Sequence, residues 1–188
     1  MGILIEGTKS NDTLTNSEAD ATLNASVGND HVINSGDGAL LLGGFGNDVL
    51  ENTGANVILD GGLGSDRLLL GGINQIIRYA NGDGNDVIHG YASTDTLHIT
   101  DGSEYTPVTN GNDVFVKVGL GTITFKNAAN LTINIERTPL NGRAMIPDNT
   151  GGLIEGGNGN DILYGTEDSD VFVYTVGTGA DTIGDLSD

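Results

Sequence analysis

The chain has 188 residues, and glycine supplies 31 of them, about one residue in six, where ordinary proteins use roughly 7%. Its 26 Asp and Glu against 7 Lys and Arg give a formal net charge of −19, which excludes nucleic acid and anionic membranes as partners because both repel an acidic surface. With no cysteine, the chain has neither disulfide bridges nor thiolate metal sites, and no stretch reaches the ~18 consecutive apolar residues of a membrane span.

A nine-residue unit repeats along the chain from Gly7 onward, with a turn in its first six positions and a short strand in its last three. The glycine-rich copies read GGFGNDVLE at 43–51, GGLGSDRLL at 61–69 and GGNGNDILY at 156–164. The true period is 18 residues, because aspartate recurs at that spacing in the sixth position of alternate units. These aspartates are Asp12, Asp30, Asp48 and Asp66, and the units between them open with Asn16, Asn34 and Asn52.

The glycine-rich copies resemble the GGxGxDxUx nonapeptide of the RTX (haemolysin-type calcium-binding) family. The resemblance covers most of 7–98 and 156–183 and is weak or absent over 99–155. It implies an all-β fold, a parallel β-roll in which two nonapeptides make one 18-residue coil and alternate turns stack on opposite edges. We call the edge with the Asp turns the aspartate edge and the one with the Asn turns the asparagine edge, and we expect only the first to bind metal.

The eighth position of every unit predicts the core of this roll. It is apolar in the aspartate units and in the asparagine units, so stacked coils would bring two rows of side chains face to face. The residues are Leu14, Val32, Leu50 and Leu68 in the first row, and Leu23, Leu41 and Leu59 in the second. One side chain for each half-coil makes a thin core, at ~1.5–3 kcal/mol for each burial. We therefore expect the fold to depend on metal.

The turn chemistry favours calcium. Glycine at the first, second and fourth positions lets the backbone adopt positive φ and turn its carbonyls inward, and Asp at the sixth adds a carboxylate oxygen. Because adjacent strands lie ~4.8 Å apart, consecutive aspartates would repel one another without a cation between them. Calcium accepts six or more such oxygens, whereas magnesium tends to keep its waters.

The family pattern, carried over residue by residue, places ions between the turns of successive coils, from Asp12 and Asp30 through to Asp66 and Asp86. The expected carboxylate ligands are Asp12, Asp30, Asp48, Asp66, Asp86, Asp161 and Asp181. The expected carbonyl donors are Gly43, Gly44, Gly46, Gly61, Gly62, Gly64, Gly82, Gly84, Gly156, Gly157 and Gly159. Asp95 and Asp170 hold sixth positions on the asparagine edge and are additional candidates. The first turn departs from the pattern, with Gly7 alone and Lys9 in the loop.

Two expanded turns interrupt the period. The spacing is 20 from Asp66 to Asp86 and again from Asp161 to Asp181, and both turns begin with a tyrosine, Tyr79 and Tyr174. We expect a widened coil in which the tyrosine enters the core. Beyond it, alternating or β-branched segments at 96–100, 114–118, 122–126 and 131–135 predict three or four antiparallel strands that cap the open end of the roll.

The domain organisation follows from these patterns. We expect a β-roll over 1–98, an antiparallel cap over 99–136, a linker over 137–150 with Pro139 and Pro147, and a second roll segment over 151–188 that stops inside its motif, as a piece of a longer protein would. Asp113 follows Gly111-Asn112, and we interpret that tripeptide as a hairpin turn. No catalytic constellation is visible, and His31, His89 and His98 lack the paired spacing of a transition-metal site.

The resemblance implies a non-enzymatic, calcium-binding structural segment of a secreted or cell-surface bacterial protein. RTX relatives leave the cell by type I secretion and fold outside on calcium, so the expected partners are calcium ions and the remainder of the parent chain. One alternative is an adhesin or glycan-recognition module that uses the roll as a scaffold, with a patch of Ile33, Leu40, Leu42 and Ile58, although we expect the cap to cover that patch. Another is an accessory domain of an RTX enzyme.

Overall fold

The computed structural model describes residues 2–138 and five short strands between residues 144 and 184. These fall into two compact units, residues 1–137 and 138–188. All regular structure in the described residues is β, as the sequence predicts, and no helix there is long and apolar enough to cross a membrane.

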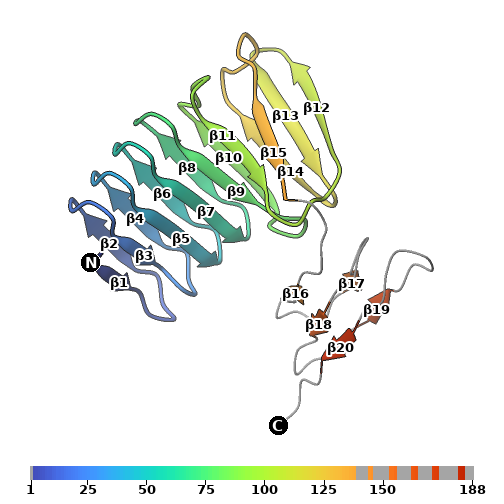
Figure 1. The fold of residues 1–188 in the computed structure, drawn as a ribbon, viewed down its shortest axis with the longest axis horizontal. Helices are drawn as coiled ribbons and strands as arrows, with labels where there is room; N and C mark the ends of the chain where they lie inside the picture. Colours follow the sequence, from blue (N-terminus) through green and yellow to red (C-terminus); the bar gives the residue numbers. More distant parts are fainter. Residues whose placement is uncertain are drawn as a thin grey trace. The chain divides into compact units, whose positions relative to one another are not determined.

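The first unit is a β-roll of two sheets that face each other, both built mainly of parallel strands (Figure 1). The first sheet has the order β1-β3-β5-β7-β9-β11-β15, with β1 (Leu4–Glu6), β3 (Thr22–Asn24), β5 (Leu40–Phe45), β7 (Ile58–Leu63), β9 (Ile76–Tyr79), β11 (Thr96–Ile99) and β15 (Asn134–Arg137). The second has the order β12-β13-β14-β10-β8-β6-β4-β2, with β2 (Thr13–Asn16), β4 (His31–Asn34), β6 (Val49–Asn52), β8 (Arg67–Leu70), β10 (Asn85–His89), β12 (Tyr105–Asn110), β13 (Asp113–Val118) and β14 (Gly121–Phe125).

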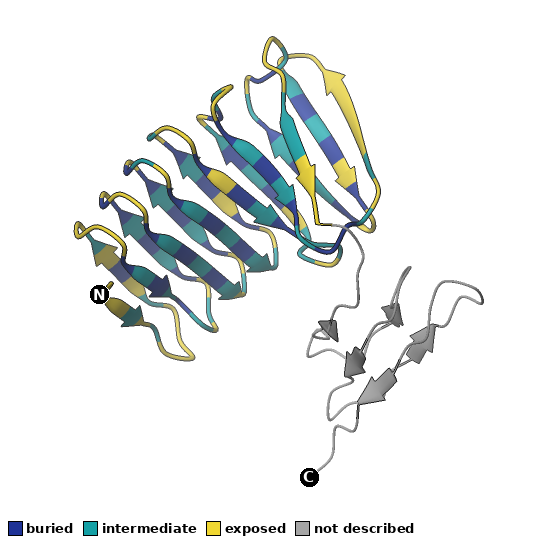
Figure 2. Cartoon of the chain, in the orientation of Figure 1, coloured by how far each residue is buried: buried dark blue, intermediate teal, exposed yellow. Residues whose placement is uncertain are grey.

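The register confirms the predicted coil of two nonapeptides. Leu41 pairs with Leu59 in the first sheet, and Val32 pairs with Leu50 in the second, each exactly one repeat along the chain. Strand residues alternate between the inside and the outside of the roll, as the buried and half-buried bands in Figure 2 show. All the predicted eighth-position residues are buried: Leu14, Leu23, Val32, Leu41, Leu50, Leu59 and Leu68.

The asparagine edge is closed by side-chain amides. Asn16 Nδ2 donates to Asn34 Oδ1 (2.8 Å), and Asn34 Nδ2 donates to Asn52 Oδ1 (2.7 Å). Asn52 Nδ2 donates to Gln75 Oε1 (2.7 Å) in the next coil. The amides of Asn34 and Asn52 also donate to backbone carbonyls two residues on. An amide both donates and accepts, so this column satisfies itself.

The same edge holds a second regularity that the sequence analysis missed. One residue in each turn adopts a left-handed backbone, and these residues stand 18 apart: Asp20, Gly38, Asn56 and Asn74. Asp, Asn and Gly are the residues that tolerate this conformation best. Their recurrence at the repeat spacing was therefore a readable signal.

The end of the roll differs from the predicted cap. Strands β12 and β13 form an antiparallel hairpin, and β14 pairs antiparallel with β13. However, β14 also pairs parallel with β10, and β15 pairs parallel with β11. The prediction that 96–100, 122–126 and 131–135 are antiparallel cap strands is thus wrong, because β11, β14 and β15 all have parallel partners in the stack. The chain makes a hairpin excursion after β11 and then re-enters the stack, so both sheets gain one more parallel strand.

The hairpin itself behaves as expected. Its outer strand, β12, is almost wholly exposed and carries Pro107, which removes a backbone donor from the open sheet edge. Asp113 begins β13 and forms an ion pair with Lys126, and its Oδ1 accepts from the Asn127 amide (2.9 Å). The interpretation of the Gly111 tripeptide as a hairpin turn is confirmed.

The proposed apolar patch is divided between the two faces of the roll. Leu40, Leu42 and Ile58 are half-buried on the outside of the first sheet, whereas Ile33 belongs to the second sheet. The hairpin strands β12 and β13 extend the second sheet beyond β14 instead of lying over these faces (Figure 1). The cap therefore does not account for the partial burial of these side chains, which comes from their neighbours in the sheet.

The second unit repeats the alternation of the first. Its strands are β16 (Ala144–Met145), β17 (Leu153–Glu155), β18 (Ile162–Tyr164), β19 (Val171–Val173) and β20 (Thr182–Gly184). β16, β18 and β20 form one parallel sheet, and β17 and β19 another. β16 lies in the stretch expected to be a linker. The candidate ligands Asp161, Asp170, Asp181, Gly156, Gly157 and Gly159 lie outside the described residues.

Candidate metal centre

The aspartates of the aspartate edge form a continuous column. The Asp12 amide donates to Asp30 Oδ1 (2.7 Å), and the Asp30 amide donates to Asp48 Oδ1 (2.7 Å). The Asp48 amide donates to Asp66 Oδ1 (2.8 Å), and the Asp66 amide donates to Asp86 Oδ1 (2.9 Å). One oxygen of each carboxylate thus ties its turn to the preceding coil. The structure brings together these five predicted ligands in chain order.

The other carboxylate oxygen is orphaned in three of these turns. Oδ2 of Asp30, Asp48 and Asp66 is buried and has no hydrogen-bond partner, and among the described residues these are the buried side-chain polar atoms in that condition. Leaving such an atom unpaired costs ~1–3 kcal/mol, and more when it carries charge. Each oxygen therefore requires a proton or a cation beside it.

Electrostatics give the same result. Burial, with the nearby Asp30 charge as a smaller cause, raises the pKa of Asp48 to about 6. Burial and the charges of Asp48 and Asp60 raise the pKa of Asp66 to about 7. Burial raises the pKa of Asp86 to about 8, with Asp66 as the largest of the neighbouring charges. In each case the hydrogen bond from the preceding aspartate's amide opposes the rise. Near neutral pH, ionising all of these carboxylates is therefore unfavourable unless a cation lies beside them.

Glycine is required beside two of the orphaned oxygens, because any side chain there would collide with them. A Cβ on Gly43 would lie 2.6 Å from Asp48 Oδ2 and closer still to the carbonyl oxygen of Gly61 in the next coil. A Cβ on Gly61 would press on Asp66 Oδ2 in the same way. Carboxylate and carbonyl oxygens therefore converge where no side chain stands. Hard oxygens of this kind suit Ca²⁺, so the residues present fit the ion.

The glycines serve two different purposes. Gly44 and Gly46 have φ of 101° and 128°, and their equivalents Gly62 and Gly64 have φ of 86° and 146°. The predicted positive φ is thus confirmed at the second and fourth positions. It is wrong at the first position, because Gly43 and Gly61 are not left-handed. At the first position glycine is needed for space beside the carboxylate.

The carbonyls at the fourth position stack closely from coil to coil. A Cβ on Gly64 would collide with the Gly46 carbonyl, and one on Gly84 with the Gly64 carbonyl. The Gly64 carbonyl accepts from the Asn85 amide (3.2 Å), and the Gly84 carbonyl accepts from the Thr122 amide (3.1 Å). Gly82 is exposed, and a Cβ there would meet nothing within 4 Å, so its surroundings are open.

Two predicted carboxylates are already satisfied by the protein. Oδ2 of Asp12 accepts from the Thr8 amide (2.6 Å) and the Thr8 hydroxyl (2.8 Å). Asp95 is buried, with Oδ1 bonded to the Gln75 amide (2.9 Å) and Oδ2 to the Ala92 amide (2.8 Å). Both carboxylates hold a turn by hydrogen bonds, and neither is among the carboxylates with a buried oxygen that lacks a partner.

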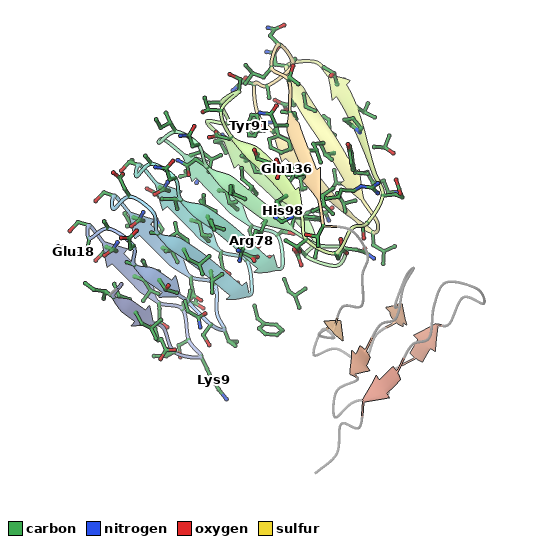
Figure 3. The ribbon with its side chains drawn as sticks, viewed as in Figure 1. Lys9, Glu18, Arg78, Tyr91, His98 and Glu136 are labelled. Carbon is green, nitrogen blue, oxygen red and sulfur yellow. The ribbon has the colours of Figure 1, made fainter. Side chains whose placement is uncertain are left out.

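The column is reinforced by amides that the sequence analysis missed. Asn11 Oδ1 accepts from the Asn29 amide (2.9 Å), Asn29 Oδ1 from the Asn47 amide (2.7 Å), and Asn47 Oδ1 from the Ser65 amide (2.8 Å). The signal was asparagine at the fifth position, repeated every 18 residues. Figure 3 marks Lys9 in the first turn of this edge and Glu18 at the opposite edge.

No group of three or more His, Cys, Asp or Glu side chains in the described part of the chain is arranged to hold a metal. An ion on the aspartate edge would therefore depend on backbone carbonyls as well as on carboxylates. His31 instead pairs with Glu51 on the outer face of the second sheet, with 2.9 Å between His31 Nε2 and Glu51 Oε1.

Comparison with known proteins supports the calcium interpretation. The RTX calcium-binding nonapeptide repeat matches with four copies, over residues 42–72, 82–103 and 153–183. No curated protein matches the sequence. Among solved structures, the extracellular lipase LipA from Serratia marcescens is similar over 68% of this chain and 38% of its own, with 13% identity and a TM-score of 0.38. This chain thus spans well under half of that lipase. The chain thus contains RTX calcium-binding nonapeptide repeats, and the copies within residues 42–103 lie in the β-roll.

Proposed function

We propose that this chain is a calcium-binding structural segment of a secreted or cell-surface bacterial protein, and that it folds as it binds extracellular calcium. The observation that carries the proposal is the set of three buried, partnerless oxygens on Asp30, Asp48 and Asp66. Calcium-binding RTX repeats, which are typical of secreted bacterial proteins, support the setting.

The orphaned oxygens rank the possible sites. Asp48 with Gly43, and Asp66 with Gly61, combine a free carboxylate oxygen with a neighbouring glycine that keeps side-chain atoms away from it. Asp30 has the free oxygen, but Ala25, which is fully buried, stands where the later coils have glycine. In Asp12, the Thr8 amide and hydroxyl both donate to Oδ2, and neither oxygen is buried without a partner. We therefore assign the strongest binding to the turns of Asp48 and Asp66, weaker binding to that of Asp30, and little to the first turn.

Coupling of folding to calcium follows from the balance of forces. The core has about one large apolar side chain for each half-coil, and 31 glycines raise the entropy cost of ordering the backbone. A net charge of −19 opposes compaction. Calcium, when bound, supplies positive charge and oxygen coordination along the edge where charge is most concentrated, so its binding energy becomes folding energy.

A structural role is favoured over recognition. The recognition alternative draws on the outward row of Leu40, Ile58 and Ile76 on the first sheet, in which Ile76 is 38% exposed. The row is flat and narrow, because its flanking row contains Asp60 and Arg78. A few half-buried side chains on a sheet face need no partner.

The test is the number of calcium ions bound per chain at equilibrium, measured by dialysis for two matched variants. Asp48→Asn keeps the Oδ1 acceptor for the Asp30 amide but removes the charge, so we expect loss of at least one ion or an affinity about 10–100-fold weaker. Asp37→Asn makes the same chemical change at an exposed position on the asparagine edge and should bind like the wild type. Unchanged binding by Asp48→Asn would mean that the aspartates only shape turns.

A further inference from the structure

The aspartate column stops at Asp86. In the next coil, the residue in register with Asp86 is Ile123, which offers no side-chain oxygen. Asp86 is also not among the described aspartates with an orphaned buried oxygen, and it is slightly more exposed (5%) than Asp30, Asp48 and Asp66 (1–2%). The backbone amide of Asp86 therefore lacks the carboxylate acceptor that the next coil provides for the amides of Asp48 and Asp66.

A tyrosine stands where the earlier coils have glycine. Asp60 pairs with Arg78, so Gly61 and Tyr79, one residue further along, hold equivalent positions. Tyr79 is only 1% exposed, and its ring fills the interior of the turn that leads to Asp86. The two extra residues between Asp66 and Asp86 belong to this turn and give the ring its room.

The tyrosine hydroxyl lies among the oxygens of the turn. It donates to the Gly84 carbonyl at 2.6 Å, and a Cβ on Gly121 in the following coil would collide with both the hydroxyl and that carbonyl. The hydroxyl thus lies between two successive turns of the aspartate edge, and it belongs to the residue that stands where earlier coils have Gly43 and Gly61.

We propose that Tyr79 closes the calcium column, with its ring excluding an ion and its hydroxyl proton taking the place of the ion at the Gly84 carbonyl. The proposal rests on the proposed function, because it presumes that the column below Tyr79 binds calcium. It sets the length of the column: ions lie beside Asp30, Asp48 and Asp66, and none lies between Asp86 and Gly121. The spacing from Tyr174 to Asp181 equals that from Tyr79 to Asp86, so the sequence extends the same expectation to the second unit.

The asparagine edge provides a control for this inference. Tyr91 is buried in the next turn, donates its hydroxyl to the Asp95 carbonyl (2.7 Å), accepts from the Asn134 amide (2.9 Å) and packs edge-on against Phe125. It is labelled in Figure 3. Tyr91 resembles Tyr79 in burial and hydrogen bonding, but it lies where no column of carboxylates exists.

The direct experiment is an anomalous difference map from crystals of the full chain grown with calcium and exchanged with terbium. We expect ion peaks beside Oδ2 of Asp30, Asp48 and Asp66, and none between Gly84 and Gly121. A peak beside the Tyr79 hydroxyl would overturn the inference and leave the proposed function standing. A map with no peak anywhere on the aspartate edge would overturn the proposed function as well.

Variants separate the ring from the hydroxyl. Tyr79→Phe should bind the wild-type number of ions and show a lower denaturant midpoint in calcium, because the Gly84 carbonyl loses the shorter of its two hydrogen bonds and keeps only the Thr122 amide. Tyr79→Gly should bind one more ion per chain, whereas Tyr91→Gly should gain none. A folded Tyr79→Gly that binds the wild-type number, or a Tyr91→Gly that also gains an ion, would overturn the role of Tyr79. If Tyr79→Gly does not fold, the wild-type map decides.

Discussion

The two edges of the roll share one backbone period and solve opposite electrostatic problems. On the asparagine edge, Asn34 and Asn52 each donate and accept, so the column of amides is complete without any other group. On the aspartate edge, Asp48 and Asp66 only accept, and one oxygen of each is left over. Stacking identical residues one coil apart is thus self-sufficient for an amide and incomplete for a carboxylate.

The difference shows why one edge of the roll is stable by itself, whereas the other needs a cation. The asparagine column carries no charge, so its burial brings no electrostatic penalty. The carboxylate column is buried, and the charges of its members raise one another's pKa. A cation removes that penalty only on the aspartate edge. The asparagine edge should therefore be insensitive to calcium, except through the folding of the roll as a whole.

The largest expected effect is on the pH dependence of the metal-free roll. Asp48, Asp66 and Asp86 have pKa values of about 6, 7 and 8 in the fold, above the value of 3.8 for a free side chain. The folded state therefore binds protons more tightly than the unfolded chain, and this stabilisation is complete below pH 4 and is lost as pH rises through 6 to 8. In chelator, β structure measured by far-UV circular dichroism should be greater at pH 5.5 than at pH 8.

Calcium should reverse that trend, because the ion replaces the protons and acid then competes with it. Asp48→Asn removes one titrating group from the column and should flatten the dependence in chelator. A metal-free chain whose β content rises with pH would contradict the electrostatic account of the aspartate edge.

A methyl group tests the space beside the carboxylates. Gly43→Ala places a Cβ against Asp48 Oδ2 and the Gly61 carbonyl, so calcium affinity should fall by about 10–100-fold. Ala25→Gly makes the opposite change beside Asp30 and should tighten binding there by a few fold. Gly71→Ala is the matched control, because its nearest neighbour would be 3.2 Å away and it lies on the asparagine edge. Equal calcium affinities for Gly43→Ala and Gly71→Ala would show that calcium binding does not require glycine at position 43.

A smaller effect is expected from the asparagine edge. Asn34→Ala removes the Oδ1 acceptor that the Gly36 backbone amide and the Asn16 side-chain amide share, and we expect the free energy of unfolding in saturating calcium to fall by about 1–3 kcal/mol. The number of ions bound per chain should stay the same. A loss of bound calcium in a folded Asn34→Ala variant would show that the two edges are not separate.

The sequence predicted whatever repeats every 18 residues. The Asp and Asn columns and the buried rows headed by Leu14 and Leu23 follow from position alone, because a parallel roll stacks equivalent residues directly. The side-chain hydrogen bonds of Asn29 and Asn47 follow the same 18-residue spacing and could also have been predicted from the sequence.

The remainder depends on three-dimensional contacts that no period encodes. The return of β14 and β15 to the parallel stack follows a hairpin of irregular length, so no spacing links Phe125 to Ile88. The closing role of Tyr79 depends on the distance from its hydroxyl to Gly84, although its burial was expected. Likewise, the free oxygen that separates Asp30 from Asp12 depends on the Thr8 contacts with Asp12.

The central claim is that the aspartate edge makes folding depend on calcium, and a calcium titration followed by far-UV circular dichroism tests it most directly. Starting in chelator at pH 8, we predict a cooperative gain of β structure with calcium and none with magnesium at the same concentration. Full β structure in chelator, unchanged when calcium is added, would contradict the account.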